Sequence, residues 1–328
     1  MDTQTAGRRL GLARRQSRTA AGLVMAVVLA GCSGGGSEAT GPGGAGPGAD
    51  VGGFAVGAFS ETYVDTSRAT AASDGVTASP ARALVTTVYY PAQSAGEGAA
   101  PAVDRGPFPL VLFSHGGGTT GTSYSNLLSR VAERGYVVAA PNYLPAAGDP
   151  GSRPADARFV LSSLLAATAQ SSHLLHGLVD EERVGAMGHS MGGGITLGYV
   201  FNSCCLDGRV RAAVLLASAH PSYPGEAFPA PGVPALVVHG DADSRASYAQ
   251  GRQLFADLRP PKYMVTVHGG EHTPPFSGEM QRPDSRMVVE ATVAFLDLHL
   301  KGEAGAAQRL RSTVADQPLV ASLDEVPR

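Results

Sequence analysis

The chain has 328 residues, of which 43% are hydrophobic and 16% charged, and its net charge is −3. This balance gives no basic surface for nucleic acid, so we expect no nucleic-acid partner. The 43 Gly and 23 Pro are numerous enough for a low-complexity chain, but the apolar share is sufficient to build a hydrophobic core.

The first 31 residues have the features of an export signal. Arginines between Arg8 and Arg18 precede the apolar run Thr19–Gly31, which is shorter than the roughly 20 residues needed to span a bilayer. Residues 29–32 are LAGC and resemble the lipobox of bacterial lipoproteins. The resemblance implies removal of residues 1–31, lipidation of Cys32 and a membrane-anchored protein of the bacterial cell envelope. Ordinary cleavage, which would release a secreted protein, is the alternative.

The residues after Cys32 predict a tether followed by one domain. Residues 33–50 carry almost no large apolar side chain and cannot offset the entropy of an ordered chain. We therefore expect a lipidated Cys32 with a glycine-rich tether over 32–50. A single domain is expected over 51–302 and a C-terminal tail over 303–328.

The domain alternates between extended and helical segments. Extended segments are predicted at Ala83–Tyr90, Leu110–Ser114, Tyr136–Ala140, Val184–Met187, Val210–Ser218, Ala235–His239 and Tyr263–His268. Helices are predicted at Ser123–Arg134, Pro154–Ala169, Ile195–Asn202, Ala246–Leu258 and Ser285–Leu300. Apolar runs such as LVLFS and YVVAA are typical of strands buried on both faces. The pattern predicts an α/β fold with a mostly parallel central sheet and helices on both faces.

The most specific motif is GHSMG at 188–192, between a predicted strand and a helix. This spacing is that of a nucleophile elbow, in which glycines two residues before and after the serine leave room for a sharp turn. The turn exposes the Ser190 hydroxyl at the edge of the sheet. His189 is expected to be structural.

A serine nucleophile requires a base and an acid. In chains with this type of elbow between a strand and a helix, the three residues occur in the order serine, acid, histidine. His272 lies in a loop after a strand and is the expected base. His268 ends the strand and His299 lies within a helix. Asp243, in the loop after Ala235–His239, is the expected acid that orients the imidazole, with Asp241 as the alternative.

An oxyanion-binding loop is predicted at Ser114-His115-Gly116-Gly117-Gly118, directly after a strand. Its glycines allow backbone N–H groups to approach a developing negative charge. We assign the oxyanion hole to the N–H groups of Gly117 and Met191, and expect His115 to be structural.

Residues 268–272 also match H-x-x-E-H, a zinc-protease motif that requires a helix. The Gly-Gly pair disfavours that helix, so we expect neither a metal nor another cofactor. The neighbouring Cys204 and Cys205 are expected to be buried thiols, with a vicinal disulfide as the alternative.

From about residue 51 to 302 the chain resembles the α/β-hydrolase superfamily. The resemblance rests on VDTSRAT (64–70), VTTVYYPA (85–92), PLVLFSHGGG (109–118), RVAERGYVVAAPNY (130–143), GHSMGGG (188–194) and CCLDGRVRAAV (204–214). Within the superfamily these segments look most like bacterial relatives of platelet-activating-factor acetylhydrolase and dienelactone hydrolase. GHSMGGG also resembles the elbow of cutinases and polyester hydrolases. That group usually has an aromatic residue where Gly117 stands, and this chain has no Trp for an aromatic clamp.

Together these features predict a serine carboxylic-ester hydrolase that acts through an acyl-enzyme on short or medium acyl esters. Polyester hydrolysis by the same residues is the first alternative. A non-catalytic binding lipoprotein on a hydrolase fold is the second, because a fold does not determine a function.

Overall fold

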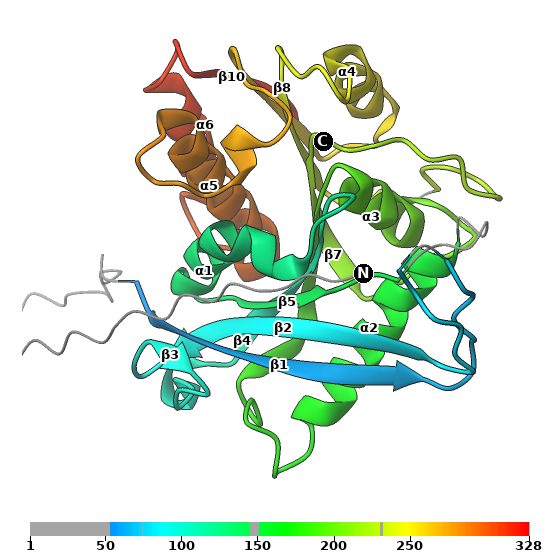
Figure 1. The fold of residues 1–328 in the computed structure, drawn as a ribbon. Helices are drawn as coiled ribbons and strands as arrows, with labels where there is room; N and C mark the ends of the chain where they lie inside the picture. The colour runs from blue at the N-terminus through cyan, green and yellow to red at the C-terminus, as the bar shows by residue number, and fades with distance from the viewer. Residues whose placement is uncertain (1–52, 74, 145–150, 230–231, 328) are drawn as a thin grey trace, which may run out of the picture. The chain divides into compact units, whose positions relative to one another are not determined.

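The computed structural model describes residues 53–73, 75–144, 151–229 and 232–327. Its centre is a twisted sheet with the strand order β10-β9-β8-β7-β6-β4-β5-β2-β1-β3 (Figure 1). The strands are β1 (Ala55–Asp65), β2 (Arg82–Ala92), β3 (Gly96–Glu97), β4 (Phe108–Ser114), β5 (Val137–Pro141), β6 (Val179–His189), β7 (Val210–Leu216), β8 (Ala235–Gly240), β9 (Lys262–Val267) and β10 (Ala321–Val326).

The middle of the sheet is parallel from β5 through β4, β6, β7 and β8 to β9. Every residue of β4, β5 and β8 is buried, as their continuous apolar runs predict. Parallel strands have their carboxyl ends at one edge of the sheet. The loops after β4, β6, β8 and β9, which carry the predicted catalytic residues, therefore meet at that edge.

Helices cover both faces of the sheet (Figure 1). The α-helices are α1 (Ser125–Glu133), α2 (Ser152–Thr168), α3 (Met191–Phe201), α4 (Tyr248–Asp257), α5 (Pro283–Leu296) and α6 (Ala306–Ala315). Short 3₁₀ turns are η1 (Val103–Arg105), η2 (Gly121–Tyr124) and η3 (Pro274–Phe276), and η4 (Asp297–Lys301) extends α5 as a π-helix. Residues of α1, α5 and α6 belong to one core cluster, and those of α2, α3 and α4 to the other. The predicted α/β architecture is confirmed.

Two strands near the ends of the sheet, β1 and β10, were not predicted from the sequence. β1 pairs antiparallel with β2, and β10 pairs antiparallel with β9. Both alternate between covered and exposed residues and so lack the apolar runs that marked the central strands. Residues 303–327 are therefore not a tail outside the domain, because α6 contributes to the core and β10 extends the sheet.

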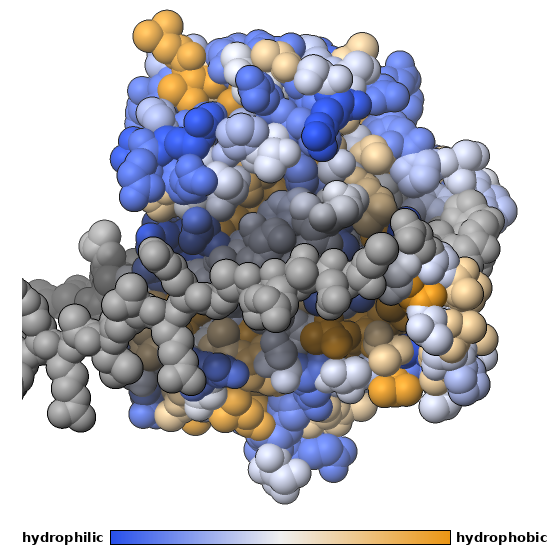
Figure 2. Space-filling model, in the orientation of Figure 1, coloured by the Kyte–Doolittle hydropathy of each residue, from blue (hydrophilic) through white to orange (hydrophobic). Residues whose placement is uncertain are grey.

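The outer strands expose some apolar surface. Val64 of β1 is 50% exposed and Val85 of β2 is 42% exposed. Figure 2 shows apolar side chains over these strands interrupted by hydrophilic ones. Exposed apolar residues scattered in this way are normal for a folded domain.

A buried ion pair connects β2 to α2, and we expect Asp156→Asn to destabilise the fold. Arg82 donates to both carboxylate oxygens of Asp156, with Nε–Oδ1 at 2.7 Å, and Asp156 is fully buried. The substitution removes a buried carboxylate charge that both Arg82 and Arg68 contact, and breaking such a buried ion pair costs about 3–5 kcal/mol in the free energy of unfolding. Urea denaturation measures this loss. The control is Asp180→Asn in the more exposed Arg183–Asp180 pair, where we expect about 1 kcal/mol or less. Equal losses in the two variants would contradict the argument.

The predicted signal peptide, the tether and Cys32 lie outside the described residues. Within the part of the chain that the structure describes, no helix has the length and apolar composition needed to cross a membrane.

Candidate active site

The structure brings together the serine, the histidine and one of the two aspartates singled out in the sequence. Ser190 Oγ lies 2.9 Å from His272 Nε2, and His272 Nδ1 lies 2.7 Å from Asp243 Oδ2. An ionised carboxylate only accepts hydrogen bonds, so His272 carries its proton on Nδ1 and Nε2 is free to accept from the Ser190 hydroxyl. This is the orientation that a general base requires.

Ser190 occupies the sharp turn between β6 and α3. Its φ of 55° lies in the left-handed region, where a residue with a side chain is strained. The first turn of α3 follows directly, so the positive end of the helix dipole points toward the serine. A Cβ on Gly188 would overlap the Gly192 carbonyl, and a Cβ on Gly192 would overlap the Ser114 carbonyl. The glycine spacing in the sequence therefore reflects close approach of backbone to backbone.

We expect Gly192→Ala to disrupt the elbow and Gly117→Ala to be tolerated. At Gly192 the added carbon would meet backbone, which cannot move without displacing the end of β4. At Gly117 the nearest atom to an added carbon is Met191 Sδ at 3.9 Å, an ordinary contact. Thermal unfolding should show a loss of roughly 3 kcal/mol or more for Gly192→Ala. The change for Gly117→Ala should be within about 0.5 kcal/mol. Comparable losses would count against a steric role for Gly192.

The predicted oxyanion loop lies beside the elbow. A Cβ built on Gly117 would lie 3.9 Å from Met191 Sδ, so the two residues are neighbours. Neither N–H donates a hydrogen bond to another described residue. Gly117 is exposed and Met191 is partly buried, so both groups are accessible to a bound ligand. The arrangement can offer two backbone donors to an oxygen that develops negative charge near Ser190.

The two aspartates after β8 have different partners. Asp243 is 8% exposed and accepts the N–H groups of Arg245 and Ala246 through Oδ1, at 2.8 and 2.9 Å. Burial alone would raise the pKa of Asp243, but the hydrogen bonds from His272 and these N–H groups outweigh it and lower the pKa. Asp241 instead accepts the Gly269 N–H at 2.7 Å and contacts His268 Nδ1 at 3.2 Å. It links the loop after β8 to the loop after β9.

The other histidines considered as candidates lie away from Ser190 Oγ or have other partners. His268 faces Asp241, and His299 packs against Phe295 in η4. His115 is a buried residue of the oxyanion loop itself, and its Nε2 accepts the Tyr143 N–H at 3.1 Å. Among the described residues, no group of three His, Cys, Asp or Glu could hold a metal ion. The H-x-x-E-H match therefore has no helix and no ligand cluster around it.

Sequence reasoning missed a buried histidine that supports the acid. His239, at the end of β8, lies 3.4 Å from Asp243 Oδ2, and its Nε2 donates to the Ala246 carbonyl at 2.9 Å. Burial lowers the pKa of His239, which keeps it neutral. Its position at the end of a buried apolar strand was the only signal in the sequence.

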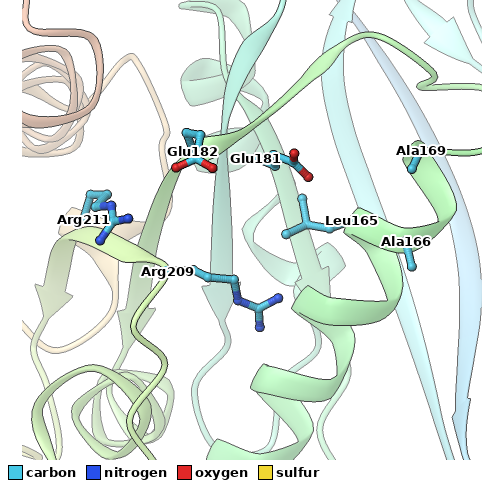
Figure 3. Close-up of a pocket in the computed structure, with 7 residues that line it drawn as sticks. All are labelled: Leu165, Ala166, Ala169, Glu181, Glu182, Arg209 and Arg211. Carbon is cyan, nitrogen blue, oxygen red and sulfur yellow. The ribbon is translucent and has the colours of Figure 1, made fainter.

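A polar cavity of about 520 Å³ lies away from these residues (Figure 3). It is lined by Leu165, Ala166, Ala169, Glu181, Glu182, Arg209 and Arg211. Glu181 and Glu182 are near the amino end of β6, whereas Ser190 follows its carboxyl end. The cavity is therefore at the opposite edge of the sheet and cannot contribute to chemistry at Ser190.

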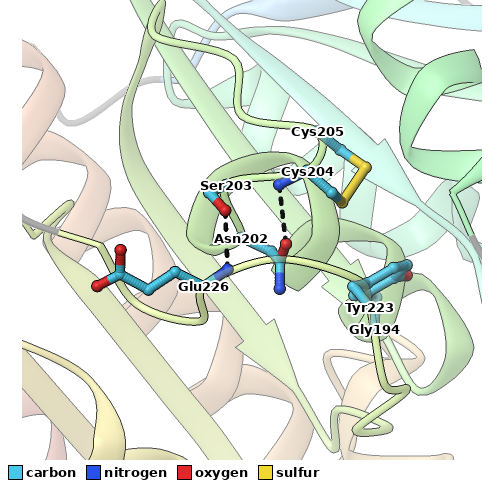
Figure 4. Close-up of a disulfide and its surroundings, with 7 residues drawn as sticks. All are labelled: Gly194, Asn202, Ser203, Cys204, Cys205, Tyr223 and Glu226. Atoms are coloured by element: carbon cyan, nitrogen blue, oxygen red, sulfur yellow. Dashed lines mark hydrogen bonds between the residues drawn. A yellow bond between two sulfur atoms is a disulfide. The ribbon is translucent and has the colours of Figure 1, made fainter.

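Cys204 and Cys205 form a disulfide, so the expectation of two thiols is wrong (Figure 4). They lie in a tight turn after α3, in which Asn202 Oδ1 accepts the Cys204 N–H at 2.9 Å. Ser203 Oγ accepts the Glu226 N–H at 2.8 Å, which joins this turn to the loop after β7. The turn directs the adjacent side chains toward each other, an orientation that composition and spacing do not reveal.

A comparison with protein families matches residues 58–303 to the PET hydrolase-like family model. The chain belongs to the PET hydrolase-like family. Similar curated proteins include a bis(hydroxyethyl) terephthalate hydrolase of Streptomyces coelicolor, 31% identical over 169 residues, which are 52% of this chain and 48% of the relative. Cutinase 1 of Thermobifida cellulosilytica is 27% identical over 192 residues, 58% of this chain and 65% of the cutinase. Lipase 1 of a Moraxella species is 28% identical over 191 residues, 57% of this chain and 52% of the lipase.

The aligned part of the chain thus spans about half to two thirds of the length of these relatives. Of the two subfamily resemblances in the sequence, the match to the PET hydrolase-like family supports the one to cutinases and polyester hydrolases.

Proposed function

We propose that this protein hydrolyses carboxylic esters through an acyl-enzyme on Ser190, and that its substrates are esters of the polyester and aromatic-diester class. The observation that supports the reaction best is the hydrogen-bonded series Ser190–His272–Asp243 at a strained elbow, beside the backbone of Gly117 and Met191. The PET hydrolase-like family match supports the proposed substrate class.

In the proposed mechanism, Ser190 Oγ attacks the ester carbonyl carbon while His272 Nε2 accepts its proton. The carbonyl oxygen becomes negative and accepts hydrogen bonds from the Gly117 and Met191 N–H groups. The C–O bond to the alcohol then breaks, and His272 returns the proton to the leaving oxygen. Water, deprotonated by His272, attacks the acyl-enzyme, and the carboxylic acid leaves as Ser190 recovers its proton. Asp243 stabilises the imidazolium at each stage.

Two departures from the family pattern point to small or flexible esters within this class. Gly117 leaves an open position beside the oxyanion site where the resemblance implies an aromatic ring, and the chain contains no Trp. A missing ring removes the stacking contact that would hold an aromatic acyl group. We therefore propose that soluble diesters and short polyester fragments react faster than a solid aromatic polyester.

A panel of substrates tests the proposal. Product release is measured from bis(hydroxyethyl) terephthalate, an aliphatic polyester film, an aromatic polyester film, p-nitrophenyl esters of increasing chain length, an acetylated phospholipid and a peptide amide. We expect turnover of the soluble diester and of short p-nitrophenyl esters, and slower release from aromatic film. Preference for acetylated phospholipid or for amides would reject the substrate class. No turnover of any ester, together with no covalent labelling of Ser190, would support a binding protein instead.

Gly117→Phe examines the open position directly. The ring would restore an aromatic contact worth about 1 kcal/mol, so we expect kcat/KM on the aromatic diester to rise roughly fivefold relative to an aliphatic ester. Steady-state kinetics on both esters measure the ratio. An unchanged ratio would show that this position does not contact the acyl group.

We also propose that the protein is a lipoprotein of the cell envelope, anchored through Cys32, on the basis of the LAGC segment. Palmitate labelling of cells expressing the full chain should mark the wild type and not Cys32→Ser. Equal labelling, or none in either, would favour a secreted protein.

A further inference from the structure

A continuous set of buried hydrogen bonds connects the oxyanion loop to the backbone of His272. The Gly116 N–H donates to Tyr124 Oη at 3.1 Å, and Tyr124 Oη lies 2.8 Å from His189 Nδ1. His189 Nε2 lies 2.7 Å from the His272 carbonyl oxygen. Tyr124 is 5% and His189 2% exposed, so water does not compete for these bonds.

The direction of every hydrogen bond in this set is determined by its ends. The His272 carbonyl can only accept, so His189 Nε2 carries the proton and Nδ1 accepts. Tyr124 therefore donates to Nδ1 and accepts from Gly116. Burial lowers the pKa of His189 to about 4, so the ring is neutral at neutral pH, as this arrangement requires.

The hydrogen-bond series begins and ends at residues of the proposed catalytic site, and His189 lies next to the nucleophile. Gly116 precedes the oxyanion donor Gly117, His189 precedes Ser190, and the accepting carbonyl is that of the base itself. The His189 ring also packs between His272 and Phe276, with ring centres 4.9 and 5.1 Å apart. A Cβ on Gly116 would lie 2.8 Å from Tyr124 Oη, so the close approach of the loop to Tyr124 depends on glycine.

We propose that Tyr124 and His189 are positioning residues that hold the oxyanion loop and the His272 backbone in register with Ser190 during both half-reactions. The inference rests on the proposed function. It matters most after acylation, because Ser190 Oγ is then esterified and can no longer donate to His272 Nε2. The bond from His189 to the His272 backbone does not involve Ser190 Oγ and keeps the base in place for the attacking water.

The test compares Tyr124→Phe, His189→Phe, the double variant and His189→Gln by pre-steady-state kinetics with p-nitrophenyl acetate. The burst gives the acylation rate and the steady state gives the deacylation rate. We expect each single variant to lower deacylation by about tenfold to a hundredfold, because small displacements of a base are costly. The double variant should be no slower than the slower single one, since either change breaks the same connection. The glutamine amide has a carbonyl oxygen that can accept from Tyr124 and an NH₂ group that can donate to the His272 carbonyl, so His189→Gln should recover part of the rate.

The matched control is Tyr90→Phe, which removes a hydroxyl that donates to the Ala99 carbonyl at 2.8 Å from a fully buried ring in β2. It should lower the melting temperature about as much as Tyr124→Phe and leave both rates unchanged. The inference is overturned if Tyr124→Phe behaves like Tyr90→Phe, or if the losses in the double variant multiply. A wild-type protein without turnover or covalent labelling would overturn the proposed function, and this inference with it. An active wild type with unaffected variants would overturn only the inference.

Discussion

Ser190→Ala is expected to lower kcat for ester hydrolysis by about a millionfold, to the level supported by the oxyanion donors and substrate binding alone. The substitution removes the only group that can form the acyl-enzyme, and His272 then has no hydroxyl to deprotonate. The elbow should still fold, because alanine is smaller than serine and the flanking glycines are unchanged. The measurements are hydrolysis of a p-nitrophenyl ester and labelling by a fluorophosphonate probe.

The control for that experiment is Ser218→Ala. Ser218 is a buried serine after β7 whose hydroxyl donates to the Ala219 carbonyl at 2.9 Å. The fluorophosphonate probe should label the Ser218→Ala variant as strongly as the wild type. Equal labelling of Ser190→Ala and the wild type would mean that the probe reacts elsewhere, and the proposed nucleophile would be wrong.

Asp243→Asn is expected to lower kcat by about 10⁴-fold with little change in the fold. The retained Oδ1 can still accept the N–H groups of Arg245 and Ala246. The amide nitrogen introduced opposite His272 Nδ1 is a donor, so the imidazole must move its proton to Nε2. That nitrogen then faces Ser190 with a proton and cannot accept the one from the hydroxyl.

Asp241→Asn provides a matched comparison, because Asp241 is two residues away, more exposed and bonded to Gly269 rather than to His272. We expect a change in kcat of less than about tenfold. Steady-state kinetics across pH 6–9 separate the two variants. A loss for Asp241→Asn as large as that for Asp243→Asn would withdraw the assignment of the acid.

The central strands and helices were predictable because their signals are local. Strands buried on both faces, such as β4 and β8, contain continuous apolar runs. The missed strands β1 and β10 have one face toward solvent, and their pairing depends on partners distant in the chain. The wrong prediction of a C-terminal tail has the same cause. Ala321–Val326 becomes a strand only where β9 offers an unpaired edge.

In the candidate site, too, features within one turn were predictable and contacts between distant loops were not. The elbow was evident because Gly188, Ser190 and Gly192 are constrained by backbone contacts within one turn and with the end of β4. The choice between Asp241 and Asp243 depends on which side chain points toward His272; the sequence favoured Asp243 with Asp241 as the alternative, and the structure places Asp243 there. His189 was expected to be structural, but its partners were not foreseen, and Tyr124 and His239 were missed. Their contacts are hydrogen bonds and a charge contact between segments separated along the chain.

By itself the sequence determined the fold class, and it singled out Ser190 as the candidate nucleophile and the carboxyl edge of the sheet as the place of the candidate site. The elbow follows from local turn geometry. The edge of the sheet follows from the alternation of strands and helices, which makes neighbouring strands parallel and brings their carboxyl ends together. Only the tertiary structure decided which aspartate meets His272, that Cys204 and Cys205 are joined, and that Tyr124 and His189 connect the oxyanion loop to the base. The first and the last depend on the direction of side chains across packed loops, which is settled only when the sheet and its helices come together. The disulfide depends on the turn after α3, whose backbone geometry the sequence does not reveal.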